Sequence, residues 1–173
     1  MKTTTTSPKL YVGTYAKYAS GSIAGAWIDL EGHDKESFLE ACRELHSDES
    51  DPELMFQDFE GFPREFYSES SVSEALFEFA NLSDEDKELV EAYADAFSFG
   101  VDLEECTIEK AREALAGQAD TEAEFAEEYT LETGSLPRDL PTWLQACIDW
   151  QAVWDSTLRF DFAHSGDFFF FNV

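Results

Sequence analysis

The chain has 173 residues, of which 43% are hydrophobic and 15% aromatic, so it can form one large core or several small ones. Its 38 acidic residues outnumber 11 basic ones, which gives a formal net charge of −27 at pH 7. A charge of this size repels nucleic acids and anionic membrane surfaces and attracts cationic groups. We therefore expect a basic protein surface or metal cations as partners, with no direct binding to nucleic acid or membrane.

The cysteines and the chain ends indicate a soluble cytoplasmic protein. Cys42, Cys106 and Cys147 are far apart in the sequence, which is typical of reduced thiols. Residues 1–9 contain four threonines and no apolar run, so no signal peptide is predicted. The apolar run at 168–171 is too short to span a bilayer. We expect a frayed N-terminal tail.

Residues 1–61 are predicted to form a small α+β domain with a three-stranded antiparallel sheet. Asp34 is a plausible N-cap, and Phe38 and Cys42 recur at helical spacing after it. The pattern predicts strands at 9–15 and 23–30 joined by a longer loop, a helix at 34–46, and a strand at 54–59.

The stretch at 48–67 interleaves carboxylates with Phe, Tyr, Met and Leu. An acidic segment without apolar residues stays disordered, because it cannot bury enough surface to offset the entropy of ordering its backbone. We therefore interpret this stretch as a strand of the scaffold, with its aromatic side in the core and its acids in solvent.

Residues 62–103 are predicted to form a helical middle domain, with helices at 71–80 and 83–97. Ser83 is a plausible N-cap, with three acids in the first helical turn. Along the second helix four carboxylates recur on one face over about 16 Å, and each like-charge contact costs about 0.2–0.5 kcal/mol. These carboxylates belong to Asp84, Glu88, Glu91 and Asp95.

Residues 104–173 are predicted to form a C-terminal α+β domain. We expect helices at 107–116, 121–133 and 142–156, followed by a β-hairpin with strands at 158–162 and 167–171. Gly117 and Gly134 directly follow the first two helices, where glycine commonly ends a helix. Acidic pairs one turn apart stand on the same two helices, namely Glu109 with Glu113 and Glu124 with Glu128.

The negative charge is distributed along the chain and not gathered in a tail. The formal charges are +3 for 1–27, −10 for 28–60, −9 for 61–103 and −11 for 104–173. Such a distribution is expected when the electrostatic field of the folded body is itself the functional surface.

Motifs for catalysis and metal binding are not found. The sequence has no nucleophile elbow, phosphate-binding loop, zinc-protease helix or dinucleotide fingerprint. His33, His46 and His164 lack the spacing of metal ligands, and we expect surface or capping roles for them. The acidic segments at 48–53 and 84–88 lack the glycine and final glutamate of a Ca²⁺ loop. We predict neither enzymatic activity nor any catalytic, cofactor-binding or metal-binding residue.

Several segments resemble the ArdA antirestriction protein family, and together they cover nearly the whole chain. In the N-terminal half they are LYVGTYAKY at 10–18, GSIAGAWIDL at 21–30, EACRELH at 40–46 and DPELMFQDFEGFP at 51–63. In the C-terminal half they are FAEEY at 125–129, ETG at 132–134, LPTW at 140–143 and IDW at 148–150. One departure is GQADT at 117–121, where the family usually has an aromatic residue in a short strand, and it counts against a third strand beside the terminal hairpin but not against the function.

The resemblance implies a protein of mobile genetic elements that acts in the bacterial cytoplasm. Such a protein protects incoming DNA from type I restriction-modification enzymes by mimicking duplex DNA, without a cofactor. The resemblance also implies an elongated molecule of three domains that forms a homodimer through its C-terminal domain.

Charge and resemblance agree on one hypothesis, an antirestriction protein that occupies the DNA-binding groove of a type I enzyme. Duplex DNA carries one charge per roughly 1.7 Å of axis, so −27 corresponds to about 46 Å of duplex. The alternatives are an acidic binding module for another basic protein, such as a nucleoid protein or nuclease, and a halophilic or Ca²⁺-stabilised domain. The carboxylates predicted to imitate phosphates are those of Asp48, Glu49, Asp51, Asp58, Glu60, Asp84, Glu88, Glu91, Asp95, Glu109, Glu113, Glu124 and Glu128.

Overall fold

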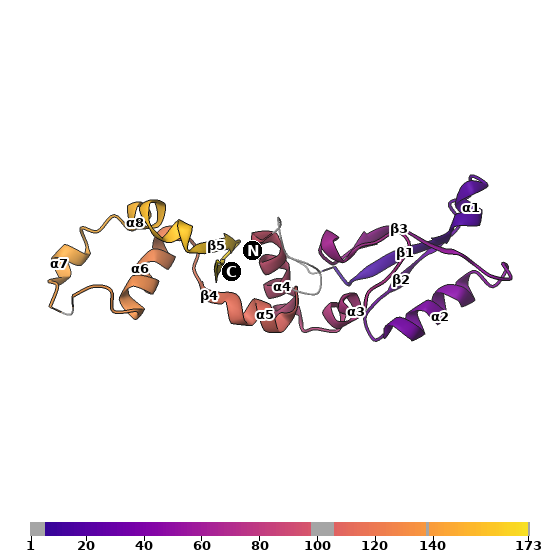
Figure 1. Cartoon of the computed structure of the whole chain (residues 1–173), viewed down its shortest axis with the longest axis horizontal. Coiled ribbons are helices and arrows are strands. Elements are labelled where there is room, and N and C mark those ends of the chain that lie inside the picture. Colours follow the sequence, from indigo (N-terminus) through magenta and orange to yellow (C-terminus); the bar gives the residue numbers. More distant parts are fainter. Residues whose placement is uncertain (1–5, 98–105, 138, 173) are drawn as a thin grey trace. The chain divides into compact units, whose positions relative to one another are not determined.

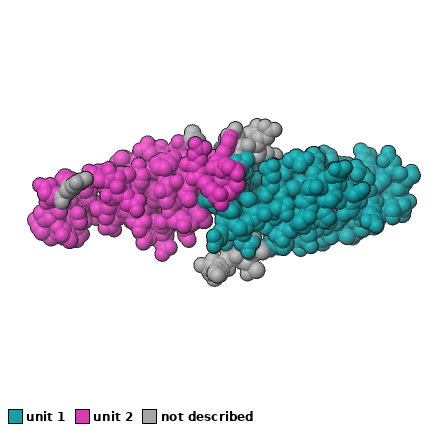
Figure 2. All heavy atoms as spheres, turned by 90° about the horizontal axis from the view of Figure 1, so that it is seen from below, with its two compact units in different colours: residues 1–91, 102–107 teal, residues 92–101, 108–173 magenta. Residues whose placement is uncertain are grey.

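A computed structural model describes residues 6–97, 106–137 and 139–172 of the chain. It combines helices with two three-stranded antiparallel sheets, which confirms the α+β class. The chain divides into two compact units, unit 1 (1–91 and 102–107) and unit 2 (92–101 and 108–173) (Figure 2). The division into three domains stays a prediction, and its boundary at 103 lies outside the described residues.

The sheet of unit 1 has the strand order β2-β1-β3, so the first strand lies in the centre (Figure 1). Its strands are β1 (Lys9–Thr14), β2 (Ala26–Asp29) and β3 (Leu54–Glu60), each antiparallel to its neighbour. Between β1 and β3 the register shifts after Tyr11, because Gln57 is an extra residue in β3. Such an extra residue changes the direction of the side chains that follow it, and beyond it Asp58 and Glu60 are both exposed.

The first two strands pair as predicted, but β2 is shorter than the expected run at 23–30 and the loop before it contains a helix. Thr14 caps α1 (Tyr15–Ala19) by accepting a hydrogen bond from the backbone N–H of Lys17. The carbonyl of Ile23 accepts a hydrogen bond from the Tyr11 hydroxyl at 2.9 Å instead of joining the strand ladder. The predicted strand at 23–30 therefore begins only at Ala26.

Helices α2 and α3 supply the other side of the unit 1 core. Asp34 and Ser37 form a capping box at the start of α2 (Lys35–Leu45), as the sequence predicts for Asp34. The ring of Phe38 on α2 lies 6.2 Å from that of Phe56 on β3 and 5.4 Å from that of Phe77 on α3 (Glu74–Ala80). A short 3₁₀ helix, η1 (Arg64–Phe66), connects β3 to this part of the chain. In the core of unit 1, aromatic rings thus connect one face of the sheet to two helices.

Helix α4 (Asp84–Ala96) contains the division between the two units. Ser83 accepts a hydrogen bond from the backbone N–H of Asp86 at 3.2 Å, so the predicted N-cap is present. Leu89 and Val90 are buried in the part of α4 that belongs to unit 1, and Tyr93 in the part that belongs to unit 2.

In unit 2, the chain turns from a helix into a strand where the sequence predicts continued helix. The first helix, α5 (Ile108–Ala114), ends two residues early, and β4 (Leu115–Gln118) follows at once. Gly117 pairs with Phe169 across the sheet, and a Cβ atom at Gly117 would lie 3.3 Å from Cε2 of Phe125. Glycine here leaves space for the Phe125 ring. Strand β4 therefore forms although it lacks the aromatic residue that the family usually has at this place.

Helix α6 (Glu122–Glu132) has the boundaries and caps that the sequence predicts. The Thr121 side chain accepts a hydrogen bond from the backbone N–H of Glu124, and Gly134 after the helix has a positive φ of 66°. Phe125 and Ala126 on this helix belong to the core cluster of unit 2, together with Trp154 and Phe169.

The predicted helix at 142–156 is wrong, because the structure contains two shorter helices there. These are α7 (Thr142–Gln145) and α8 (Trp150–Ser156). Asp149 between them has an extended backbone, and its carboxylate accepts a hydrogen bond from the N–H of Ala152. An aspartate that caps a new helix competes with continuation of the preceding one.

The terminal hairpin exists, but its strands lie closer together in sequence than predicted. Residues 158–160 form a 3₁₀ helix, η3 (Leu158–Phe160), and not part of a strand. Strands β5 (Phe162–Ser165) and β6 (Phe168–Phe171) pair from Phe162 with Phe171 to Ser165 with Phe168. This register leaves a two-residue turn in which Gly166 has a positive φ of 56°, as such tight turns require. The order of this sheet is β4-β6-β5.

Candidate functional site

The candidate site is a set of surface carboxylates spread over both units. Of the thirteen carboxylates that the sequence selects, all but Glu49 and Glu91 are exposed. Acidic residues outnumber basic ones in each unit, 24 against 7 in unit 1 and 14 against 4 in unit 2. Each unit taken by itself therefore presents a negative field to a partner.

On α4 the four selected carboxylates do not have equal exposure. Asp84, Glu88 and Asp95 are exposed, whereas Glu91 is half-buried. Burial, and secondarily the charge of Glu88, raises the pKa of Glu91, while Lys87 acts in the opposite direction. Asp95 accepts a hydrogen bond from the Ser165 hydroxyl at 2.6 Å. Asp84 and Glu88 are thus the members of this group that the structure places most clearly in solvent.

Carboxylates in the segment after α2 are partly held by other residues of unit 1. Asp48 accepts a hydrogen bond from the Lys17 ammonium at 2.8 Å, and Glu49 accepts one from the Thr14 hydroxyl at 2.7 Å. The hydrogen bond from Lys17 holds the pKa of Asp48 below its usual range. Asp51 is exposed. Glu49 therefore contributes less to the surface field than its position in the sequence suggests.

Two carboxylates lie at the end of β3, where exposed residues alternate with half-buried ones. Asp58 and Glu60 are both exposed, and Phe59 between them stacks on Tyr67 with ring centroids 4.6 Å apart. Glu60 forms a salt bridge of 2.8 Å with Lys9 on the neighbouring strand β1. This arrangement agrees with the interpretation of 48–67 as a strand of the scaffold.

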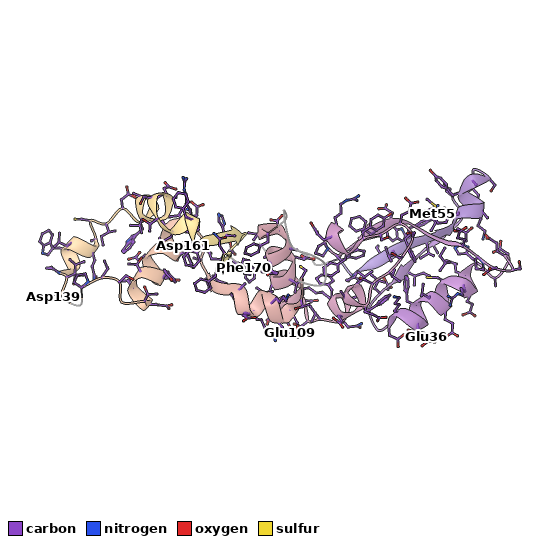
Figure 3. The ribbon with its side chains drawn as sticks, viewed as in Figure 1. Glu36, Met55, Glu109, Asp139, Asp161 and Phe170 are labelled. Atoms are coloured by element: carbon purple, nitrogen blue, oxygen red, sulfur yellow. The ribbon has the colours of Figure 1, made fainter. Side chains whose placement is uncertain are left out.

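In unit 2 the selected carboxylates are exposed on two helices. Glu109 and Glu113 lie one turn apart on α5, and Glu109 is labelled in Figure 3. Glu124 and Glu128 lie one turn apart on α6 and line an open pocket of about 330 Å³. Asp120 and Asp167, which the sequence did not single out, line the same pocket.

A further acidic row lies on α2, outside the set that the sequence selects. Glu36, Glu40 and Glu44 are exposed and recur every four residues, and Glu36 projects from the side of the helix away from the sheet (Figure 3). This i, i+4 spacing, which Asp84 and Glu88 of α4 also have, is visible in the sequence and could have identified the row.

Basic residues near the carboxylates are held in ion pairs within unit 1. Lys87 is only 2% exposed, and its ammonium lies 2.5 Å from the carboxylate of Glu31. Lys35 lies 3.9 Å from Glu74. Such pairing stabilises the fold locally and leaves the remaining surface acids to dominate the field.

The histidines and cysteines form no metal centre in the part of the chain that the structure describes, where no group of three or more possible ligands is found. His46 caps α2 as predicted, but it is buried and not on the surface. His164 lies 3.1 Å from the carboxylate of Glu122. All three cysteines are free, and burial raises the pKa of Cys42 to about 12 and that of Cys106 to about 11. These two buried thiols are protonated at neutral pH and therefore poor nucleophiles.

Among the described residues no helix combines the length and the apolar character needed to cross a membrane.

Comparison with known proteins identifies the family. A family model described as Antirestriction protein (ArdA) matches residues 10–171, which is nearly the full length of the chain. No curated protein matches the sequence. Because the family model covers both compact units and every carboxylate discussed above, the chain belongs to the ArdA family of antirestriction proteins.

Proposed function

We propose that this antirestriction protein mimics the charge and shape of duplex DNA and occupies the DNA-binding groove of type I restriction-modification enzymes. The observation that carries the proposal is the distribution of exposed carboxylates over both units of a chain from the ArdA family. A groove that binds DNA is lined by basic residues and attracts an acidic body of this kind. The protein then acts by binding, without catalysis and without a cofactor, in the cytoplasm of a bacterial host.

The driving force is the same as for DNA binding. Each basic residue of the groove that contacts a carboxylate releases counterions, so the affinity falls as the salt concentration rises. The biological result is protection of incoming mobile DNA, because the occupied enzyme no longer binds its substrate.

We further propose a homodimer formed through residues 104–173. The proposal is supported by large apolar side chains in this segment that are exposed in the single chain, Trp143 at 67% and Phe160 at 63%. Light scattering is expected to give twice the chain mass, and Trp143→Ser with Phe160→Ser is expected to reduce it to that of one chain.

The central test measures inhibition of a purified type I enzyme at increasing DNA and salt concentrations. We expect inhibition that DNA relieves competitively and that weakens steeply with salt. Inhibition that persists unchanged in excess DNA and in high salt contradicts the proposal.

The alternative of a binding module for another basic protein gives a different result in the same assay. Such a module leaves the type I enzyme active at every concentration, while it co-purifies with a nucleoid protein or a nuclease from a host lysate.

A further inference from the structure

The sheet of unit 1 has an outer face, the one away from α2, that carries aromatic rings. Val12 of β1 pairs with Phe56, whose ring contacts Phe38 of α2, so these residues are on the covered face. Side chains alternate along a strand, which places Tyr11 on the outer face, together with Trp27, its partner on β2. The centroids of the Tyr11 and Trp27 rings are 5.5 Å apart. A pair of contacting aromatic rings is thus part of this face.

The ring of Trp27 already binds a cation of its own unit. Nζ of Lys9 lies 5.0 Å from the centroid of the Trp27 ring and 2.8 Å from the carboxylate of Glu60. The face of an aromatic ring attracts a cation through its quadrupole, and a carboxylate nearby adds an ion pair. Lys9 therefore shows, within the structure, the two contacts that this face offers to a cation.

Asp29 provides a second carboxylate beside the same ring. It follows Trp27 by two positions on β2, so the two side chains are on one face, about 6.6 Å apart along the strand. Asp29 is exposed, and among the described residues its carboxylate has no hydrogen bond or ion pair. The ammonium of Lys9, the residue opposite Asp29, is bound to Glu60 instead. Asp29 is thus available to a cation from outside.

The ring of Trp27 is accessible from the edge of the sheet. Lys9 and Tyr11 both contact it from β1, on one side of β2. In the order β2-β1-β3 no strand of this sheet lies on the other side of β2. Trp27 is 38% exposed, a large fraction for a tryptophan that has two neighbours. Part of the indole is therefore open to a group that approaches from this edge.

We propose that Trp27 and Asp29 bind an arginine side chain of a basic partner protein. The guanidinium group is planar, so it can stack on the indole while two of its N–H groups donate to the carboxylate. A lysine ammonium has no planar face for stacking and meets a carboxylate as a compact, strongly hydrated point charge. This surface is therefore selective for arginine over lysine.

The selectivity distinguishes this surface from the rest of the acidic body. Exposed carboxylates alone attract any cation, whether it is arginine or lysine. The net charge of −27 brings a basic partner to the chain, and the ring beside Asp29 then favours one kind of basic residue. The inference does not rest on the proposed function, since any partner with an accessible arginine meets the same two side chains.

The test compares hexa-arginine with hexalysine as probes of the full-length protein at neutral pH and low salt. Nuclear magnetic resonance follows the indole N–H of Trp27 and the backbone N–H of Asp29 as each peptide is added. We expect these signals to reach half of their change at an about three- to tenfold lower concentration of hexa-arginine than of hexalysine. An equal response to the two peptides overturns the proposal.

The backbone signals of Asp84 and Glu88 provide an internal reference for binding by charge alone. Both residues are exposed, and Tyr93, the single aromatic residue of α4, is buried. The two peptides should differ less at these signals than at Trp27. A preference for arginine that is equally large on α4 also overturns the proposal.

Variants separate the contribution of the ring from that of the carboxylate. Trp27→Leu keeps an apolar side chain on the edge strand, so Asp29 should lose its preference for hexa-arginine and still respond to hexalysine. Asp29→Asn should weaken the response of Trp27 to hexa-arginine more than Asp51→Asn does, which changes the same charge at another exposed residue of unit 1. An arginine preference that persists in Trp27→Leu, or equal effects of the two aspartate variants, contradicts the proposal. The backbone signal of the buried Phe56 checks that each variant folds.

Discussion

The ring of Phe125 on α6 lies parallel to the ring of Phe169 on β6, with centroids 4.1 Å apart and an interplanar angle of 3°. Trp154 and Phe162 contact the same Phe125 ring edge to face, at 6.0 and 5.0 Å. One buried aromatic side chain therefore connects a helix, the terminal hairpin and α8 within unit 2.

Truncation of this ring should destabilise unit 2. Phe125→Ala is expected to lower the free energy of unfolding by about 3–5 kcal/mol, because it removes a buried ring and leaves a cavity. Phe171→Ala is the control, since that ring is 43% exposed, and its loss should be smaller. Hydrogen exchange should show the loss of protection in α6, β5 and β6, and equal losses for the two variants would contradict this assignment.

Added volume at Gly117 should disturb the same contact from the other side. A Cβ at this position lies 3.3 Å from Cε2 of Phe125, so the ring has to give way. We expect Gly117→Val to destabilise the protein by about 1–3 kcal/mol through overpacking, and Gly117→Ala to have a smaller effect. Thermal unfolding measures both, and a Gly117→Val variant as stable as the wild type would mean that the ring is not confined.

Removal of the charge from Glu91 should stabilise the protein at neutral pH. Its pKa is raised mainly by burial, so the protonated form favours the folded state, and this contribution is lost as the pH rises through the folded-state pKa. Relief of the like-charge contact with Glu88 alone is expected to add about 0.2–0.5 kcal/mol.

The measurement compares the melting temperatures of Glu91→Gln and wild type between pH 7 and pH 4. The gain from Glu91→Gln should shrink as the pH falls below the usual range for a glutamate, because wild-type Glu91 is then protonated as well. Glu88→Gln changes an exposed residue of the same helix and serves as the control. A gain of equal size at both ends of the pH range would point to a cause other than this titration.

Acid should weaken the start of α2 through Asp34. The backbone N–H of Ser37 donates a hydrogen bond to the Asp34 carboxylate at 2.8 Å, and this bond holds its pKa below the usual value. The associated stability is present above the ordinary aspartate pKa and is lost as the pH falls through the lowered one. Asp34→Asn retains a capping side chain without this titration, so its α2 amides should lose protection less steeply in acid.

Two double variants should separate carboxylates that are held within the fold from those that are available to a partner. Asp84→Asn with Glu88→Gln neutralises exposed residues, so it should weaken inhibition with little change in stability. The slope of log affinity against log salt concentration should fall by about 1 for each carboxylate that pairs with the groove. Asp48→Asn with Glu49→Gln removes partners of Lys17 and should lower the melting temperature instead. Inhibition assays and thermal melts on both variants provide the comparison, and the reverse pattern would exclude this division.

Local signals in the sequence predicted much of the fold correctly. The caps at Asp34, Ser83 and Thr121 are present, and the predicted strands and helices of unit 1 occur in the predicted order, although helix α1 in the first loop was not predicted. These features depend on hydrogen bonds and apolar spacing within a few residues, which the sequence displays directly. The family resemblance, now supported by a match over residues 10–171, has the same origin in contiguous segments.

The incorrect predictions have two causes: a strand partner that lies far away in the chain, and a cap that competes with continuation of a helix. Strand β4 forms by pairing with β6, where Gly117 lies opposite Phe169, and no pattern near Gly117 indicates that partner. The helix at 142–156 is interrupted at Asp149, whose role as a cap depends on the backbone that it adopts in the fold.

The sequence by itself determined the composition of the surface: a folded chain with a charge of −27, spread over its whole length, that belongs to an antirestriction family. Only the tertiary structure decided which of those charges remain available. Lys17 meets His46 across 29 positions of the sequence and engages Asp48 and Glu49, while Glu91 is half-buried and Glu88 is exposed on the same helix. The physical reason is that the charge of a side chain is a local property, whereas its burial and its ion pairs depend on elements that folding brings together.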